Sequence, residues 1–392
     1  QNADIGQAVE NNTTKIAEKN SKYKNPVKPL KYVLMCLAVI LLASLLLILW
    51  ITKSGMHPWG SDTWGHLFKV DLLASEINSG NIYPLFSDLW YNGTQPFRYW
   101  APLPYYLLFA LRFIAGGNIV LTYNIFIVFI FIAGDLGWVF WGVRTGRHKI
   151  ALVLALLWFV LPDNLRVFFS EGNIPRIMVT TIFPYLMLGV WGYLEKRNKK
   201  SLLLVFGCMF LITLCHAMIS AMVGVIIFIY VFIHSCLFKK IRPSVEVLTA
   251  AVLGICLSGL WLYPALKGGM VSLNQEAVIA AVKELTTPAA ISLNPVLRLQ
   301  GGKELFYFGI SIIVISIFGL VFSDRKSKIG FIIVMLIFIG STSELLPIVT
   351  KIPLSSLFWM WRFTPLALGV FFISLLEWKN LKKGVIAALI GI

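Results

Sequence analysis

The chain alternates long apolar stretches with short basic clusters over most of its length. Eleven stretches approach or reach the roughly 20 consecutive apolar residues that a transmembrane helix needs. They are residues 32–52, 119–143, 149–162, 174–194, 201–216, 218–238, 244–265, 305–323, 329–344, 361–378 and 384–392. The pattern predicts an all-α polytopic membrane protein with about eleven transmembrane helices and a transmembrane domain over residues 32–392.

The basic clusters predict the orientation of these helices. Lys and Arg near the ends of membrane spans are retained on the cytoplasmic side. The clusters are Lys15 to Lys31, Arg144 to Lys149, Lys196 to Lys200, Lys239 to Arg242, Arg325 to Lys328 and Lys379 to Lys383. If all six clusters lie in the cytoplasm, successive spans cross the membrane in opposite directions without conflict. The N-terminus is therefore predicted to be cytoplasmic. Residues 1–31 are then a cytoplasmic basic arm, for which membrane lipid is the expected partner and nucleic acid is not.

One apolar stretch, residues 103–116, does not fit this alternation. It is short and contains Arg112, and if it crossed the membrane every later cluster would change sides. We therefore expect an interfacial helix, whose polar side chains reach the lipid headgroups. It belongs to a long first outer loop, residues 53–118, and a second long outer loop is predicted at residues 266–304.

Composition agrees with a membrane protein and narrows the function. The chain is 58% hydrophobic and 13% charged, with a mean hydropathy of +0.80, whereas soluble domains carry about twice that charged fraction. The net charge of +16 lies mainly in the basic clusters beside the spans. The five cysteines have no metal-like spacing, and the lack of a P-loop excludes an ATP-driven pump in this chain alone.

The first outer loop contains a candidate acid–base pair, Asp62 and His66. If a helix covers 61–79 with Ser61 or Asp62 near its N-cap, both side chains face the same direction. A carboxylate beside an imidazole is then a plausible proton-accepting pair. In the alternative interpretation, Asp62 only caps the helix and His66 packs under Trp64, and the residues alone leave both open.

The next outer turn, residues 161–176, concentrates charge between two apolar spans. Residues 170–173 directly precede a span and indicate a helix start. Glu171 is therefore a catalytic candidate, and Asp163 and Arg166 are binding candidates. Simple solvation of these charges is the alternative.

Three isolated polar residues complete the candidates. His216 lies at a two-residue outer hairpin, where helix capping is the alternative role. Arg362 lies in an aromatic belt, where an arginine either snorkels to the interface or holds a lipid phosphate. Asp135 lies within a span, where a carboxylate is a functional candidate, but Gly134 and Gly137 favour tight helix packing with an internal partner for the carboxylate.

The order of several motifs resembles the C-type (GT-C) membrane glycosyltransferases. These motifs are Gly-Ser-Asp-Thr-Trp-Gly-His (60–66), Arg-Tyr-Trp-Ala-Pro-Leu-Pro-Tyr-Tyr (98–106), Ser-Glu-Gly-Asn-Ile-Pro-Arg (170–176) and Phe-Trp-Met-Trp-Arg-Phe (358–363). More narrowly, residues 32–378 resemble a bacterial membrane-protein family labelled 6-pyruvoyl-tetrahydropterin synthase-related, although nothing here resembles a pterin enzyme.

The resemblance implies a transferase in a bacterial plasma membrane, with its active site on the outer face. The catalytic acid of the first outer loop maps onto Asp62, and a second acidic site maps onto Glu171 or Asp163. The donor is a polyprenyl-phosphate sugar, and the acceptor is a glycan or lipid of the cell envelope. The signature here is Asp-x-x-x-His instead of paired acids, so we expect no metal and no other cofactor.

A mechanism follows as a hypothesis. Asp62 acts as general base on the acceptor hydroxyl, and a positive charge holds the phosphate leaving group. The candidates for that charge are Arg98, Arg176, Arg362, His66 and His216. Tyr99 and Trp100, with Trp59 and Trp64, are candidates for stacking on sugars. The rival hypotheses are a flippase or transporter for lipid-linked glycans, which would need polar mid-membrane residues, and a non-catalytic partner subunit.

Overall fold

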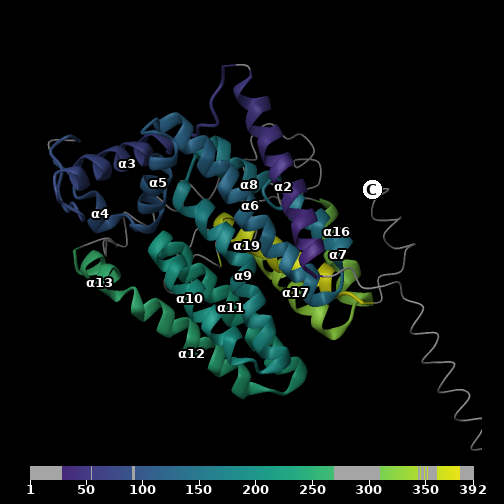
Figure 1. The fold of residues 1–392 in the computed structure, drawn as a ribbon. Helices are drawn as coiled ribbons and strands as arrows, with labels where there is room; N and C mark the ends of the chain where they lie inside the picture. The colour runs from purple at the N-terminus through teal and green to yellow at the C-terminus, as the bar shows by residue number, and fades with distance from the viewer. Residues whose placement is uncertain are drawn as a thin grey trace, which may run out of the picture.

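The computed structural model describes residues 29–53, 55–90, 93–268, 310–342 and 360–379, and the single residues 345, 348 and 351. Helices make up most of this part of the chain (Figure 1). They are α2 (Pro29–Thr52), α3 (Thr63–Asn78), α4 (Pro96–Tyr99), α5 (Leu103–Ile114), α6 (Ile119–Thr145), α7 (His148–Trp158), α8 (Pro162–Leu165), the π-helix η1 (Arg166–Glu171), α9 (Ile174–Lys196), α10 (Lys199–Cys215), α11 (Ala217–Phe238), α12 (Ile241–Leu257), α13 (Gly259–Lys267), α16 (Ile310–Phe322), α17 (Arg325–Gly340), the 3₁₀ helix η3 (Met360–Phe363) and α19 (Thr364–Glu377). Extended pairing in these ranges is limited to one antiparallel bridge between Ser87 and Thr94.

The predicted helical membrane protein is confirmed, but the number of about eleven spans is not. Four helices, α2, α6, α9 and α11, are long and apolar enough to cross a membrane. Six spans result if two bent pairs each form one span, namely α7 with 163–171, bent by 41°, and α12 with α13, bent by 69°. Several predicted spans are helices of only 13 to 17 residues (α10, α16, α17 and α19). At about 1.5 Å per residue these fall short of a bilayer core about 30 Å thick.

Close packing of α6 against its neighbours forms the centre of the bundle. The indole rings of Trp138 and Trp158 lie 5.2 Å apart, and the ring of Phe372 lies 5.2 Å from Trp138 and 5.7 Å from Trp158. Tilted and edge-to-face aromatic contacts of this kind stabilise a core beyond simple burial. The α6 helix thereby holds α7, which carries Trp158, and α19, which carries Phe372.

The predicted role of Gly134 and Gly137 in helix packing is confirmed. A Cβ atom at Gly134 would lie 2.5 Å from the ring of Phe159, and one at Gly137 would lie 2.7 Å from Pro184. Asp135 is buried between them, and its Oδ1 has no hydrogen-bond partner in the described ranges. The internal partner predicted for this carboxylate was therefore not found there.

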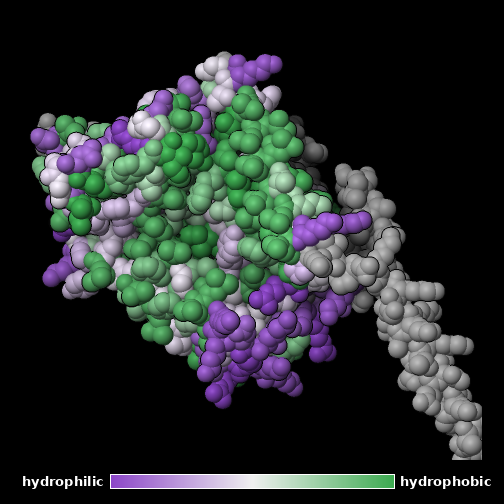
Figure 2. Space-filling model, viewed as in Figure 1, coloured by the Kyte–Doolittle hydropathy of each residue, from purple (hydrophilic) through white to green (hydrophobic). Residues whose placement is uncertain are grey.

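The described residues of the six predicted basic clusters lie together at one end of the bundle, as contacts between these segments show. Tyr32 donates to the carbonyl of His148, and Arg147 donates to the carbonyl of Trp378. Further contacts are the Lys326–Glu195 and Arg197–Glu246 ion pairs and the Lys379 N–H donating to Asp324. Figure 2 shows hydrophilic side chains at the lower end of the molecule and on the α3–α4 side, with a broad hydrophobic surface between them.

Helices α3, α4 and α5 form a group beside the bundle, on the left in Figure 1, and α13 approaches it from below. The α5 helix packs against both α3 and α6. The hydroxyl of Tyr99 donates to the carbonyl of Gly268 at 2.8 Å, which joins α4 to the end of α13. A helix within 103–116 is confirmed as α5, and its interfacial position stays a prediction. Residues 1–28 of the arm, 269–304 of the second outer loop and the span 384–392 lie outside the described residues.

Candidate active site

The loop before α3 is joined to the turn before α9 by their backbones. The N–H of Asp62 donates to the carbonyl of Glu171 at 2.7 Å, and that of Ser61 donates to Ser170 at 3.0 Å. The contact depends on two glycines. A Cβ at Gly60 would overlap the backbone of Gly172, and a Cβ at Gly172 would overlap the hydroxyl of Thr63. The two loops that were predicted to carry catalytic acids therefore form one structural unit.

Asp62 occupies the N-cap position of α3, as predicted, but its side chain does not cap the helix. The side chain is exposed. Its Oδ1 accepts a hydrogen bond from the Ser61 hydroxyl and its Oδ2 accepts one from the Asn173 amide, both at 3.3 Å. The capping interpretation is therefore wrong, and the carboxylate faces a cavity.

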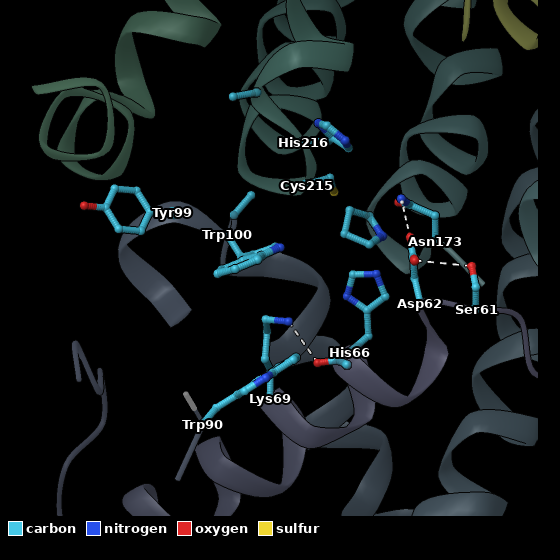
Figure 3. Close-up of a pocket in the computed structure, with 14 residues that line it drawn as sticks. Ser61, Asp62, His66, Lys69, Trp90, Tyr99, Trp100, Asn173, Cys215 and His216 are labelled. Atoms are coloured by element: carbon cyan, nitrogen blue, oxygen red, sulfur yellow. Dashed lines mark hydrogen bonds between the residues drawn. The ribbon is translucent and has the colours of Figure 1, made fainter. Parts of the chain in front are cut away.

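This cavity has a volume of about 540 Å³ and lies between α3, α4 and the turns that precede α9 and α11. Of the predicted residues, five line it, as Figure 3 shows: Asp62, His66, Tyr99, Trp100 and His216. Three other polar residues of the lining, Ser61, Lys69 and Asn173, were not among the predicted site residues. A cavity of this size accommodates a ligand of several tens of atoms.

His66 is held on the cavity wall by a buried tyrosine, not by Trp64. Its Nδ1 lies 2.9 Å from the Tyr105 hydroxyl, and its Nε2 is buried without a hydrogen-bond partner in the described ranges. Burial, and then the charge of Lys69, lower the pKa of His66 to about 3. The imidazole is therefore neutral and a weak base. His66 and Asp62 face the same cavity as predicted, but no hydrogen bond joins their side chains.

Lys69 places a positive charge on the same wall, one helical turn after His66. Its Nζ donates to the carbonyl of Gly65 at 2.9 Å and lies 4.3 Å from the ring centre of Trp100 and 5.1 Å from that of Trp90. Burial lowers the pKa of Lys69 to about 8, although Asp62 opposes this shift. A signal for Lys69 was present in the sequence, because residues 62, 66 and 69 share one helical face.

Glu171, in contrast, is held by two arginines and lies outside the described lining of the cavity. Its Oε1 accepts from Arg166 and its Oε2 accepts from Arg176, while Arg166 also binds Asp163 at 2.8 Å. Burial raises the pKa of Glu171, but Arg176 and Arg166 outweigh it and lower the pKa below its ordinary value. These four predicted residues thus form an ion-pair network that supports the loop behind Asp62.

The remaining predicted residues lie at the edge of this region. Arg98 donates to Gln95 at 3.0 Å and lies 5.6 Å from the Tyr99 ring centre. Arg362 approaches the sulfur of Met218 at 3.7 Å. Neither arginine belongs to the described lining of the cavity. His216 belongs to it, at the junction of α10 and α11.

Metal ligands do not gather in the described ranges, where no group of three His, Cys, Asp or Glu residues is placed to hold an ion. The polar groups on the cavity wall instead include one carboxylate, one amide, two imidazoles, one ammonium group and the hydroxyls of Ser61 and Tyr99. Such a set suits proton transfer and anion binding. The expectation that the protein works without a metal or other cofactor stays a prediction.

Comparison with known proteins agrees with the predicted fold. No curated protein matches the chain. A cryo-EM structure of a mutant form of the arabinofuranosyltransferase AftD from Mycobacteria matches with a TM-score of 0.55 at 14% identity. The match covers 94% of this chain but only 27% of AftD, so the chain spans about a quarter of that protein. The likeness confirms that the chain shares its fold with part of this arabinofuranosyltransferase.

A family model matches the larger part of the sequence. It describes a 6-pyruvoyl-tetrahydropterin synthase related domain of membrane proteins and matches residues 97–392. That range contains ten of the eleven predicted spans and the turn with Glu171. The chain therefore belongs to the 6-pyruvoyl-tetrahydropterin synthase related family of membrane proteins.

Proposed function

We propose that the protein is a membrane glycosyltransferase. It moves a sugar from a polyprenyl-phosphate donor to a hydroxyl of a cell-envelope glycan or lipid, with Asp62 as general base. The observation that carries this proposal is the position of Asp62. Its carboxylate is held by Ser61 and Asn173 in a cavity whose wall also carries Lys69, on the same face of α3. The fold shared with an arabinofuranosyltransferase supports the same class of reaction.

The chemical step is a displacement at the anomeric carbon of the donor. The acceptor oxygen forms a bond to that carbon as its proton passes to Asp62, and the bond from the carbon to the phosphate oxygen breaks. The bonding electrons leave with the phosphate, whose charge changes from one to two negative charges. Because phosphate is a good leaving group, the step needs a base and a cation but no general acid.

Asp62 suits the role of base better than His66 or Glu171. The His66 ring is buried and its Nδ1 is already hydrogen-bonded to the Tyr105 hydroxyl, whereas the Asp62 carboxylate is exposed to the cavity. Glu171 already accepts from two guanidinium groups, so its role in this proposal is to position Asp62 through the backbone. Tyr99 and Trp100 line the cavity and offer ring faces to a sugar.

The orientation in the membrane is part of the proposal. We place the basic end and the N-terminus in the cytoplasm and the cavity on the outer face of a bacterial plasma membrane. Nucleotide sugars are confined to the cytoplasm, so an enzyme with an outer active site needs a donor that is carried across the membrane on a lipid.

A comparison of cell-surface glycans tests the proposal. The source cell would be examined without the gene and after its restoration as wild type, Asp62→Ala or Asp71→Asn at matched membrane levels. Asp71 lies on the same helix but pairs with Arg112 away from this cavity. We expect wild type and Asp71→Asn to restore a missing sugar and Asp62→Ala to fail. Equal restoration by Asp62→Ala contradicts a transferase that uses this carboxylate and favours a flippase or a partner subunit.

A further inference from the structure

Lys69 is a buried cation without a carboxylate partner in the described part of the chain. Its residue is 3% exposed, and none of the ion pairs found among the described residues includes it. One of its three N–H groups donates to the carbonyl of Gly65, and the ring centres of Trp100, Trp90 and Tyr105 lie 4.3, 5.1 and 5.9 Å from its Nζ. Asp62 attracts this charge without contacting it, and burying an ammonium group that no carboxylate contacts is costly. Such a group on a cavity wall indicates that an anion completes the site.

His66 supplies a second and independent observation. It is 6% exposed, lines the same cavity, and its Nε2 is buried without a hydrogen-bond partner in the described ranges. A neutral imidazole has a single N–H. With the Tyr105 hydroxyl donating to Nδ1, that hydrogen lies on Nε2 and can be donated to a ligand. Lys69 and His66 then offer two donors from adjacent turns of α3.

We infer that Lys69 and His66 form the binding site for the phosphate of a prenyl-phosphate ligand, with the acceptor hydroxyl on the Asp62 side of the cavity. The inference rests on the proposed function and names the cation that the reaction needs. Figure 3 shows Lys69 and Asp62 on opposite sides of the His66 imidazole, so the phosphate and the acceptor hydroxyl lie toward different ends of the cavity.

The chemistry of the site favours phosphate. The lysine ammonium is a compact charge with several donors, which suits a tetrahedral anion. Trp90 and Trp100 shield it from water, so its attraction for an anion is stronger than at an exposed surface. The charge of the phosphate increases during the proposed displacement, so a fixed cation here stabilises the transition state more than the ground state.

Binding of a defined probe tests the site without any need for catalysis. The purified protein in nanodiscs would be titrated with farnesyl phosphate, with farnesol and with inorganic phosphate, and binding followed by calorimetry. We expect farnesyl phosphate to bind at least about tenfold more tightly than farnesol, because a charge-assisted hydrogen bond contributes roughly a factor of ten or more. If inorganic phosphate competes with farnesyl phosphate, the protein binds the phosphate headgroup and not the prenyl chain.

Four variants make the result specific to Lys69. We expect Lys69→Gln to lose at least about tenfold in affinity for farnesyl phosphate, Lys69→Arg to retain most of it, and His66→Gln to lose less than Lys69→Gln does. Lys240→Gln changes an exposed lysine at the basic end and should bind as wild type does. The fold of each variant would be checked by its gel-filtration profile.

The inference fails if well-folded Lys69→Gln binds farnesyl phosphate as tightly as wild type, or if wild type does not distinguish farnesyl phosphate from farnesol. Its failure is distinct from that of the proposed function. If the binding of farnesyl phosphate depends on Lys69 but no sugar is transferred, the phosphate site is supported and the transferase proposal is contradicted. If Lys69→Gln transfers sugar at the wild-type rate, the transferase proposal is supported and the phosphate site at Lys69 is contradicted.

Discussion

The backbone N–H of Asp62 donates a 2.7 Å hydrogen bond to the carbonyl oxygen of Glu171. This bond fixes the first residue of the proposed catalytic helix to the turn that precedes α9. The position of the Asp62 carboxylate thus depends on a second outer loop, far away in sequence.

Gly172→Ala should disrupt the junction. Gly172 has a φ of 67° and its added Cβ would overlap Thr63, so the turn has to move away from Asp62. Gly146 has a φ of 73° and nothing within 4 Å of an added Cβ, so Gly146→Ala carries the same backbone cost, about 1 kcal/mol, without the clash. We expect Gly172→Ala to lower the rate of sugar transfer at least about tenfold and Gly146→Ala to leave it near that of wild type. Equal rates for the two variants would show that the junction does not position Asp62.

Glu171→Gln should destabilise the protein and lower kcat more than it changes KM. The substitution leaves Arg176, whose side chain is 4% exposed, without its carboxylate partner, and breaking a buried pair in this way costs about 3 kcal/mol. Asp71→Asn removes a more exposed pair with Arg112 and should cost no more than about 1 kcal/mol. Thermal unfolding in detergent and steady-state kinetics measure both effects. If Glu171→Gln is destabilised but has a normal kcat, the ion-pair network stabilises the fold and does not position Asp62.

The affinity for farnesyl phosphate should decrease in alkaline solution. The pKa of Lys69 is lowered to about 8 by burial against Trp90, Trp100 and Tyr105, with Asp62 opposing the shift and His66 neutral. Below pH 8 the ammonium form is present, and it is lost as pH rises through 8. Affinity should thus fall by up to about tenfold per pH unit above 8, while the phosphate stays a dianion.

Lys69→Arg provides the control for this pH dependence, because a guanidinium group stays protonated throughout the range. Calorimetric titrations between pH 7 and 9.5 should give a nearly constant affinity for Lys69→Arg. A wild-type affinity that does not change over this range, or a decrease of the same size in Lys69→Arg, would assign the effect to another group.

Cysteine labelling tests the orientation of the chain. Ile82→Cys and Arg242→Cys place thiols on exposed side chains of the predicted outer loop and the basic end. The exposed Cys236 and Cys256 would first be replaced by serine. In intact cells, a membrane-impermeant maleimide should modify Ile82→Cys but modify Arg242→Cys only after permeabilisation. The reverse pattern would place the cavity in the cytoplasm and remove the reason for a lipid-linked donor.

Local patterns in the sequence were sufficient to predict the helix starts near the site. The residues before α3 and α9 were predicted as helix starts, and Asp62 occupies the N-cap position of the first. Asn173 caps α9 by accepting the Arg176 N–H at 3.2 Å. Such features depend on a few neighbouring residues, which is why they can be read from the chain alone.

The roles of the charged residues were harder to predict because they depend on distant contacts. Lys69 looks like a solvated lysine on an amphipathic stretch, and only the fold brings Trp90 and Trp100 over it. Arg176 was a candidate for holding phosphate, but its guanidinium pairs with Glu171 in the same turn. The number of about eleven spans is not confirmed, since several apolar stretches in the described ranges, such as α10, form helices shorter than a bilayer core requires.

The initial rate of sugar transfer by Asp62→Asn tests the central claim most directly. The sugar that is missing in cells without the gene would be supplied on a short prenyl phosphate to reconstituted wild type and Asp62→Asn. The account predicts that Asp62→Asn loses about 10²- to 10⁴-fold in rate while its affinity for farnesyl phosphate stays near that of wild type. Transfer at the wild-type rate by Asp62→Asn would contradict the assignment of Asp62 as the base.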